Sequence, residues 1–361
     1  MKYVDEFRDR KIIDKLASEI REAVDPGRQY NIMEVCGTHT MNVFRFGLRS
    51  LLTPNINLIS GPGCPVCVTP NEYLDKAIWL AGRNDIIIAT FGDMFRVPGS
   101  YSSLEKEKVK GNAIKMVYST TDALALARKN PRQEVVFLGI GFETTIPTVA
   151  QSIIAAKREG IKNYSVLCGH KTMPAALKAI AEDKKIRVDG FLLPGHVSAV
   201  IGAAPYVFLA KKYCKRCVIT GFEPADILQA ILMVVRQKTP RVEIQYTRII
   251  AGSGNFLARK SIERVFKKSA AEWRGMGKIK DSGLEIRPEF KDYDADVKFK
   301  PKPKKARENK ACICGDVIKG VKKPADCKLF GKICNPISPV GSCMVSSEGT
   351  CSAYYKYSYK L

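Results

Sequence analysis

Residues 56–67, INLISGPGCPVC, join a short apolar strand to a turn that carries two thiols. Two glycines and two prolines restrict the backbone between Gly61 and Pro65. Cys64 and Cys67 on this turn suit reversible disulfide chemistry or two-point ligation of a metal. Buried cysteines are common, but packing alone does not explain glycine and proline on both sides of the pair. We therefore interpret this turn as a redox or metal site.

The same pattern, an apolar strand followed directly by a glycine-bearing or polar loop, occurs at eight places. The predicted strands are residues 32–35, 58–59, 86–90, 114–118, 135–138, 165–167, 191–193 and 217–220. Helical patterns cover residues 5–23, 121–129, 148–158, 173–183 and 225–237. Strands that alternate with helices predict parallel sheets, whose functional groups gather at the carboxyl ends of the strands. We therefore expect the glycine-bearing loops to form the site.

The domain organisation follows from a change in pattern along the chain. Eight units also fit a single (β/α)8 barrel, but the polar approach to the fourth unit, residues 105–115, indicates a boundary near residue 125. We predict an α/β fold with two doubly wound parallel-sheet domains and a C-terminal iron–sulfur cluster domain packed with the N-terminal helix. The predicted parts are residues 1–24 (helix), 25–125, 126–250 and 251–361. Within the last part, residues 262–273 are predicted to be helical.

Composition excludes several classes of protein. With 361 residues, 45% of them hydrophobic and 26% charged, the chain is typical of a globular protein with two or three domains. No apolar run reaches the roughly 20 residues that span a bilayer. The charged N-terminal stretch differs from a signal peptide. We expect a cytoplasmic protein without a membrane partner, whose 12 cysteines serve metal or redox chemistry.

The chain is strongly basic, with 59 Lys and Arg against 36 Asp and Glu and a net charge of +23. Such a charge raises nucleic acid as a partner. However, the excess is spread over the chain, apart from one dense block at residues 298–310, KFKPKPKKARENK. Prolines interrupt this block, so we interpret it as a flexible linker and expect no nucleic-acid partner. The motif Gly139-X-Gly141 lacks the rest of a dinucleotide fingerprint, and no bound nucleotide is expected either.

The C-terminal region contains six cysteines within 40 residues, at positions 312, 314, 327, 334, 343 and 351. Iron–sulfur clusters are held by four thiolates on irregular backbone, and this stretch is rich in glycine and proline. A structural zinc site is the alternative. Either way, the spacing indicates a metal centre.

Cys36-Gly-Thr-His39 follows the first predicted strand. A thiolate and an imidazole three residues apart can share a metal; they can also form a nucleophile with its base, or serve structure alone. The chain has three histidines, His39, His170 and His196, and all follow predicted strands. This placement favours function, as ligand or proton carrier, over simple loop packing.

Glu143 opens a helix just after Gly139 and Gly141. Helix capping explains the threonines that follow, but it does not explain the acid, which makes Glu143 a candidate site residue. Cys214 and Cys217 form another pair with two residues between them. That pair precedes a strand, at the end opposite to the other loops, and we assign it no function.

These residues together resemble the HypD family of hydrogenase maturation proteins. The motifs that carry the resemblance are CGTHT at 36–40, GPGCPVC at 61–67, GFETT at 141–145, PGHVS at 194–198, GFEP at 221–224 and the tail at 327–357. They occur in order over nearly the whole chain.

The resemblance implies a factor that scaffolds assembly of the Fe(CN)2CO unit of [NiFe] hydrogenases, and thus serves the hydrogenase large subunit indirectly. It implies a small HypC-type chaperone and a HypE-type cyanide donor as partners. Cys36 would bind the iron together with a cysteine of a partner, with His39 beside it. Cys64 and Cys67 would form a redox dithiol between the iron and a [4Fe–4S] cluster.

The implied cluster ligands are Cys314, Cys327, Cys334 and Cys351, which leaves Cys312 and Cys343 spare. Glu143 and His196, from the matching GFETT and PGHVS motifs, complete the candidate catalytic set.

The implied chemistry suits these residue types. Iron that carries cyanide and carbon monoxide is low-spin and soft, so thiolate ligands fit it. Cyanide transfer from a thiocyanate-type donor needs two electrons; a cluster delivers one at a time, whereas a dithiol stores two. Two alternatives remain at this stage. One is a cluster-coupled thiol–disulfide oxidoreductase that acts on a protein substrate, and the other is a nucleic-acid-binding protein with a zinc-bound tail.

Overall fold

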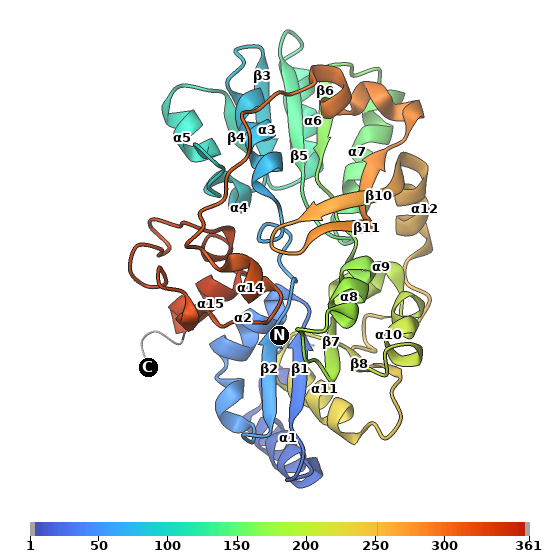
Figure 1. Cartoon of the computed structure of the whole chain (residues 1–361). Helices are drawn as coiled ribbons and strands as arrows, with labels where there is room; N and C mark the ends of the chain where they lie inside the picture. The colour runs from blue at the N-terminus through green and yellow to red at the C-terminus, as the bar shows by residue number, and fades with distance from the viewer. Residues whose placement is uncertain (1–3, 251, 358–361) are drawn as a thin grey trace.

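The structure is a computed structural model of the 361-residue chain, and it describes residues 4–250 and 252–357. Two parallel β-sheets lie at opposite ends of the molecule (Figure 1). An antiparallel hairpin and the cysteine-rich tail lie at the level between them (Figure 1). The α/β class with two parallel sheets is as predicted, and the single-barrel alternative is excluded.

The first sheet has five parallel strands. In spatial order they are β2 (Ile56–Ser60), β1 (Tyr30–Glu34), β7 (Gly190–Pro194), β8 (Arg216–Thr220) and β9 (Val242–Ile244). The second sheet has four parallel strands. They are β4 (Ile114–Met116), β3 (Ile86–Thr90), β5 (Glu134–Gly139) and β6 (Tyr164–Cys168).

The chain passes between the two sheets, so the predicted boundary near residue 125 does not separate them. It makes β1 and β2 in the first sheet, β3 to β6 in the second, and then returns to the first sheet for β7 to β9. The first sheet therefore combines segments that are distant in sequence, whereas the second is formed by one continuous stretch of the chain, β3 to β6. Strand periodicity predicts that a strand forms, but not which neighbour it pairs with.

Helices cover the sheets and connect the strands. The α-helices up to residue 201 are α1 (Arg10–Ala23), α2 (Gly37–Arg45), α3 (Asn71–Ala81), α4 (Gly92–Phe95), α5 (Leu104–Val109), α6 (Thr120–Lys129), α7 (Ile146–Arg158), α8 (Met173–Glu182) and α9 (Gly195–Ile201). The later ones are α10 (Val207–Lys211), α11 (Pro224–Arg236), α12 (Phe256–Val265), α13 (Ala295–Phe299), α14 (Cys314–Ile318) and α15 (Thr350–Tyr357). Short 3-10 helices are η1 (Asp5–Arg8), η2 (Leu48–Leu51), η3 (Ala204–Tyr206), η4 (Pro288–Tyr293), η5 (Pro324–Asp326) and η6 (Ser342–Met344).

One apolar core joins the two sheets. It contains Met33 and Phe191 of the first sheet, Ile88 and Val136 of the second, and Trp273 of the hairpin. Separate apolar clusters lie on the outer faces, under α6 and α7 on one sheet and under α1 and α11 on the other. Each sheet is thus covered on both faces, as its continuous apolar strands require.

The eight predicted strands and the five predicted helices are present, with ends that differ by a few residues. The prediction of a helix over residues 262–273 is wrong in its second half. Helix α12 ends at Val265, and β10 (Phe266–Trp273) pairs with β11 (Gly277–Ile286) in an antiparallel hairpin. Phe266 and Trp273 are buried at the two ends of β10, so tertiary packing overrides the helical pattern.

The expected packing of the C-terminal domain on the N-terminal helix is also wrong. Helix α1 packs on α11, where Ile20 and Val24 share an apolar cluster with Ile227 and Ile231. The tail instead places α15 against α2. Between hairpin and tail, the basic linker runs as an extended strap beside α3 (Figure 1), and the carbonyl of Arg307 accepts hydrogen bonds from two side chains.

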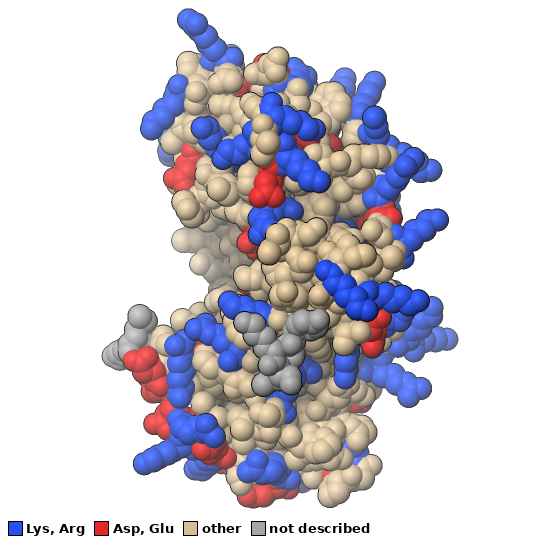
Figure 2. All heavy atoms as spheres, turned by 90° about the vertical axis from the view of Figure 1, so that its left-hand side faces the viewer, with Lys and Arg blue, Asp and Glu red and all other residues tan. Residues whose placement is uncertain are grey.

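Lys and Arg are scattered over the face seen in Figure 2, rather than gathered into a single stripe. None of the helices within the described ranges is both long and apolar enough to cross a bilayer.

Candidate functional site

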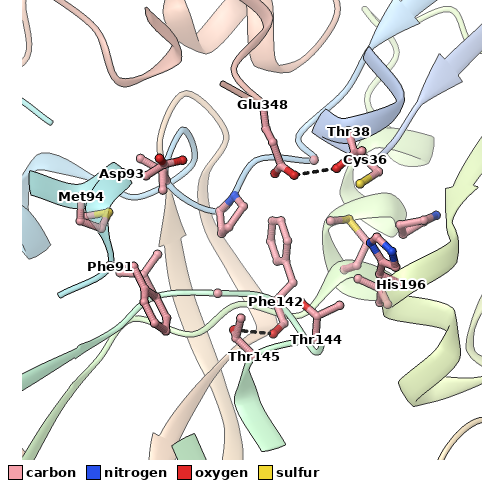
Figure 3. A pocket seen from close by; sticks show the side chains of 18 of the residues that line it. Cys36, Thr38, Phe91, Asp93, Met94, Phe142, Thr144, Thr145, His196 and Glu348 are labelled. Carbon is pink, nitrogen blue, oxygen red and sulfur yellow. Dashed lines mark hydrogen bonds between the residues drawn. The ribbon is translucent and has the colours of Figure 1, made fainter. Parts of the chain in front are cut away.

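The carboxyl ends of strands from both sheets meet at one cavity of about 410 Å³. The loops after β1, β2, β3, β5 and β7 all contribute to its wall, together with one loop of the tail. The polar and thiol side chains that line it are those of Cys36, Thr38, Asp93, Thr144, Thr145, His196 and Glu348 (Figure 3). Parallel strands place the loops that follow them at one edge of a sheet. Because the chain passes from the first sheet to the second and back, these edges of the two sheets lie together.

Cys36 directly precedes α2 and is partly exposed to this cavity. Burial and, to a smaller extent, the nearby carboxylate of Glu348 together raise the pKa of its thiol to about 12. The backbone amides of Thr38 and His39 at the start of the helix oppose this shift. The thiol is therefore protonated at neutral pH, and a metal that binds there must displace the proton.

The Cys-X-X-Cys turn is held directly against Cys36. A Cβ atom added to Gly63 would lie 1.9 Å from the carbonyl oxygen of Val35 and 2.5 Å from the Cα of Cys36. Only glycine permits that approach. The two cysteine motifs, distant in sequence, thus share one wall of the cavity.

The two candidate histidines His39 and His196 stack on the same aromatic ring, but only His196 lines the cavity. Phe222 is stacked against both rings, with centroids 4.7 Å from His39 and 4.0 Å from His196. The ring of His196 lines the cavity, and partial burial lowers its pKa. The ring of His39 is fully buried and does not line the cavity; its Nε2 lies 3.0 Å from the carbonyl oxygen of Gly221.

The Nδ1 of His39 has no hydrogen-bond partner within the described part of the chain. Burial lowers the pKa of His39 to about 4. The ring is therefore a neutral imidazole, which is the form that ligates metals.

Two acids of the cavity escaped the sequence analysis. Glu348 accepts a hydrogen bond of 2.6 Å from the hydroxyl of Thr38 (Figure 3). Asp93 accepts one of 2.7 Å from the hydroxyl of Ser346. Burial raises the pKa of Glu348. Glu348 lies in the SSEG sequence of the tail motif and Asp93 in the loop after β3, but only the fold shows that both line the same cavity as Cys36.

Cys64 and Cys67 form a disulfide with a Cα–Cα distance of 5.2 Å, and both are buried. Ser342 of the tail connects this pair to the tail cysteines. Its hydroxyl donates a hydrogen bond of 3.0 Å to the carbonyl of Cys67 and lies 4.0 Å from the sulfur of Cys314. The turn thus lies between the main cavity and the tail cysteines.

All six tail cysteines line one small, apolar cavity. They are Cys312, Cys314, Cys327, Cys334, Cys343 and Cys351. The sulfurs of Cys314 and Cys343 are 2.8 Å apart. Hydrogen bonds from the neighbouring thiols Cys312 and Cys343 lower the pKa of Cys314.

This donor set fits an iron–sulfur cluster, which takes thiolates in an apolar surrounding. No three His, Cys, Asp or Glu side chains within residues 4–250 and 252–357 converge closely enough for a single metal ion. A cluster is wider than one ion, so thiols spread around a cavity suit it better. The four predicted ligands, Cys314, Cys327, Cys334 and Cys351, are among the six, and Cys312 and Cys343 line the same cavity.

Glu143 does not line the cavity of Cys36, although its neighbours in the sequence do. Its neighbours Phe142 and Thr144 line the cavity, whereas its own carboxyl faces the opposite side of the loop and lines a second cavity. His170 is buried away from Cys36 as well, in a third cavity that contains Cys168. Cys214 is exposed and Cys217 is buried in β8, and the two form no disulfide.

Known proteins are similar to this chain over nearly its whole length. The model of the HypD family, described as the hydrogenase formation hypA family, matches residues 11–358. Hydrogenase maturation factor HypD2 of Bradyrhizobium diazoefficiens is 48% identical, over 99% of this chain and 97% of that protein. The hydrogenase expression/formation protein HupD of Azotobacter chroococcum is 49% identical, with the same coverage. Hydrogenase maturation factor HypD of Escherichia coli is 42% identical, over 99% of this chain and 98% of that protein.

Proposed function

Because this chain belongs to the HypD family of hydrogenase maturation factors, we propose that it is the scaffold on which the Fe(CN)2CO unit of [NiFe] hydrogenases is assembled. The observation that carries the proposal is the position of Cys36. Its thiol opens to a cavity whose wall includes the Cys-X-X-Cys turn, and that turn contacts the tail through Ser342. An iron-binding thiol, a two-electron store and a cluster site therefore follow one another through the molecule.

Iron is the substrate of this site, and Cys36 is its anchor. A single thiol does not hold iron alone, and no second cysteine lines the cavity among the described residues. A cysteine from a small HypC-type chaperone would complete the thiolate pair, with the chaperone bound at the mouth of the cavity. The Nδ1 of His39, which has no hydrogen-bond partner among the described residues, would offer a neutral nitrogen. The ring of His196, which lines the cavity, would carry a proton there.

Cys64 and Cys67 would supply the two electrons for cyanide transfer from a HypE-type donor. The thiocyanate group of the donor, R–S–C≡N, takes two electrons from the dithiol. The S–CN bond breaks, cyanide leaves for the iron, the donor regains its thiol, one proton is released, and the two cysteines form their disulfide. The disulfide must then be reduced for another turnover.

A [4Fe–4S] cluster, when held by four of the tail cysteines, would supply those electrons one at a time. The residues proposed to hold it are Cys314, Cys327, Cys334 and Cys351. Ser342 keeps the disulfide next to this site, because it contacts both Cys67 and Cys314. The maturation context implies that the hydrogenase large subunit receives the finished unit indirectly, through the chaperone.

A cluster-coupled oxidoreductase acting on a protein substrate is less well supported. Cys64 and Cys67 are only 4% and 2% exposed, so a protein disulfide has no direct access to them. A small cyanide-bearing group reaches the turn more easily through the cavity.

The test is an infrared spectrum of the anaerobic protein, co-expressed with its HypC-type partner. We expect cyanide and carbonyl bands that vanish in Cys36→Ala, while the visible absorbance of the cluster remains. Cys168→Ala is the matched control, because Cys168 also follows a strand but lies outside the cavity; it should keep the bands. A spectrum without bands, with partner bound and cluster present, would refute the scaffold.

A second variant tests the role of His39. His39→Gln retains a side-chain donor for the carbonyl of Gly221 but removes the imidazole. A shift of the cyanide and carbonyl bands in this variant supports ligation by His39. Unshifted bands at full intensity assign the ring to packing against Phe222 alone.

A further inference from the structure

The second cavity, which Glu143 lines, is larger than the cavity of Cys36 and lies apart from it. It measures about 600 Å³ and is enclosed by the start of α8, the end of α9, α12 and the hairpin, which meet at one side of the molecule (Figure 1). This volume is within the range of small-molecule sites, about 300–1,000 Å³. Its apolar wall is formed by Ile146, Ala175, Ile201, Ile262, Phe266 and Leu284.

Four basic side chains line this cavity: Arg259 from α12, Lys267 and Lys268 from β10, and Arg287 after β11. Two of them are already engaged. Lys267 pairs with Glu285 at 2.7 Å, and the Nε of Arg287 donates to the carbonyls of Glu263 and Phe266. Arg259 and Lys268 have no ion pair within the part of the chain that the structure describes. Two cationic groups are thus left for an anion.

Glu143 provides an independent observation, because its carboxyl is only 4% exposed and lines the same cavity. Its Oε1 accepts a hydrogen bond of 3.0 Å from the amide of Met173, while its Oε2 has no partner. The Nε of Arg259, also shielded from solvent, has none either. A buried polar atom without a partner costs about 1–3 kcal/mol. The residues that line this cavity therefore include one acceptor without a donor, the Oε2 of Glu143, and one donor without an acceptor, the Nε of Arg259.

Burial raises the pKa of Glu143 to about 7, and the charge of Lys268 opposes that shift. The exposed acids Glu263 and Asp281 lie at the rim of the cavity. The cavity thus combines a basic rim, an apolar wall with one aromatic ring, and a single buried acid. This combination matches a molecule with an anionic end, a flat apolar body and an N–H group.

We propose that this second cavity binds a ring-bearing organic phosphate, such as a nucleoside monophosphate. Arg259 and Lys268 would contact the phosphate, whose two negative charges match the two available cations. Phe266 would contact the ring, and Glu143 would accept the N–H group. The absence of nucleotide fingerprints in the sequence does not count against this site, because side chains rather than a glycine-rich loop would hold the phosphate.

Glu143 connects the second cavity to the first, because the residues on either side of it in the loop line the cavity of Cys36. Its loop neighbours, Phe142 and Thr144, line the cavity of Cys36. A molecule held by Glu143 would rest on the other side of the wall that faces the iron site. The binding itself does not depend on the proposed function and can be tested without partners, iron or cluster activity.

The experiment is isothermal titration calorimetry of the full-length protein with AMP, adenosine and inorganic phosphate at one fixed ionic strength. AMP should bind at least tenfold more tightly than either fragment, because only AMP satisfies both ends of the cavity. Arg259→Gln and Lys268→Gln should each weaken AMP binding at least tenfold. Lys260→Gln, on the same helix but outside the cavity, should leave it unchanged. Arg259→Lys, which keeps the charge, should restore part of the affinity and shows that the fold survives substitution there.

Three results would overturn the proposal. The first is no binding of AMP at millimolar concentration. The second is equal weakening by Lys260→Gln, because that marks general attraction to a basic surface. The third is phosphate that binds as tightly as AMP, which leaves the ring and Glu143 without a role.

Discussion

Cys67 and Ser342 contact each other across 275 residues of sequence, with the hydroxyl of Ser342 donating a 3.0 Å hydrogen bond to the carbonyl of Cys67. The sulfur of Cys67 lies 4.0 Å from the carbonyl oxygen of Ser342. Ser342 is fully buried. This contact joins the turn beside Cys36 to the tail.

Replacing Ser342 by alanine should lower the free energy of unfolding by about 1–2 kcal/mol, because the carbonyl of Cys67 loses its buried donor. Chemical denaturation under anaerobic conditions measures this change. Ser338→Ala, at an exposed position of the same tail, should change stability by less than about 0.5 kcal/mol. Equal effects of the two substitutions would contradict the structural role of the contact.

The reactivity of Cys36 should depend on Glu348. With a thiol pKa of about 12, alkylation of Cys36 by iodoacetamide in the isolated protein should be slow at pH 8 and rise about tenfold per pH unit up to pH 11. Glu348→Gln removes a negative charge that raises this pKa, so alkylation should become several-fold faster. Mass spectrometry of the Cys36 peptide follows the rate. Glu289→Gln, at an exposed position outside the cavity, serves as control, and an unchanged rate in Glu348→Gln would contradict the electrostatic account.

Gly63 should tolerate no side chain. Gly63→Ala brings a Cβ to 1.9 Å from the carbonyl oxygen of Val35, so the backbone must move, and stability should fall by roughly 1–3 kcal/mol or more. Because the turn then leaves Cys36, iron binding should also weaken. Gly92→Ala offers the comparison at the same cavity, since a Cβ there meets no atom within 4 Å. If the two variants unfolded at the same temperature, the close approach of Gly63 to Val35 and Cys36 would not matter for stability.

The free energy of unfolding should depend on pH because of the raised pKa of Glu143. Its pKa is about 7 in the folded protein against a usual value of 4.5, so between these values the folded state holds a proton that the unfolded state has lost. The stability that the protonated acid contributes is complete below pH 4.5 and is lost as the pH rises through 7. Relative to Glu143→Gln, the protein should therefore lose about 3 kcal/mol over this range.

Urea denaturation of both proteins at several pH values measures that difference. A constant difference between the two from pH 4.5 to 8 would show that Glu143 titrates normally.

Much of the fold was predictable because its signals are local. An apolar run such as residues 135–138, followed directly by a glycine-bearing loop, favours a buried strand, and in a parallel sheet that loop lies at the carboxyl end of the strand. Cys36, the turn at Cys64 and Cys67, and His196 could therefore be assigned to the carboxyl ends of strands from the sequence, but only the structure places those strands in one sheet. The hairpin at residues 266–286 could not, because Phe266 and Trp273 fit a helix or a strand and only their burial decides.

The candidate site was predictable in its residue types and less so in its geometry. Glu143 follows the same motif logic as its neighbours, yet its carboxyl faces a different cavity. Adjacent side chains in a loop leave in different directions, and sequence spacing does not specify which. Glu348 lies in the tail, more than 300 residues from Thr38 in the sequence, yet its carboxylate accepts a hydrogen bond from the Thr38 hydroxyl.

The sequence by itself determined the α/β class, the strands and their glycine-bearing ends, the family, and the thiols available for chemistry. These properties depend on residue type and on spacings of a few positions, which act through local backbone geometry and burial. The tertiary structure alone decided that the first sheet combines strands from both halves of the chain, that Ser342 connects the turn at Cys67 to the tail cysteines, and that Glu143 belongs to a second cavity. Such contacts join segments far apart in the chain, and their free energy depends on the packing of the complete core rather than on any local pattern.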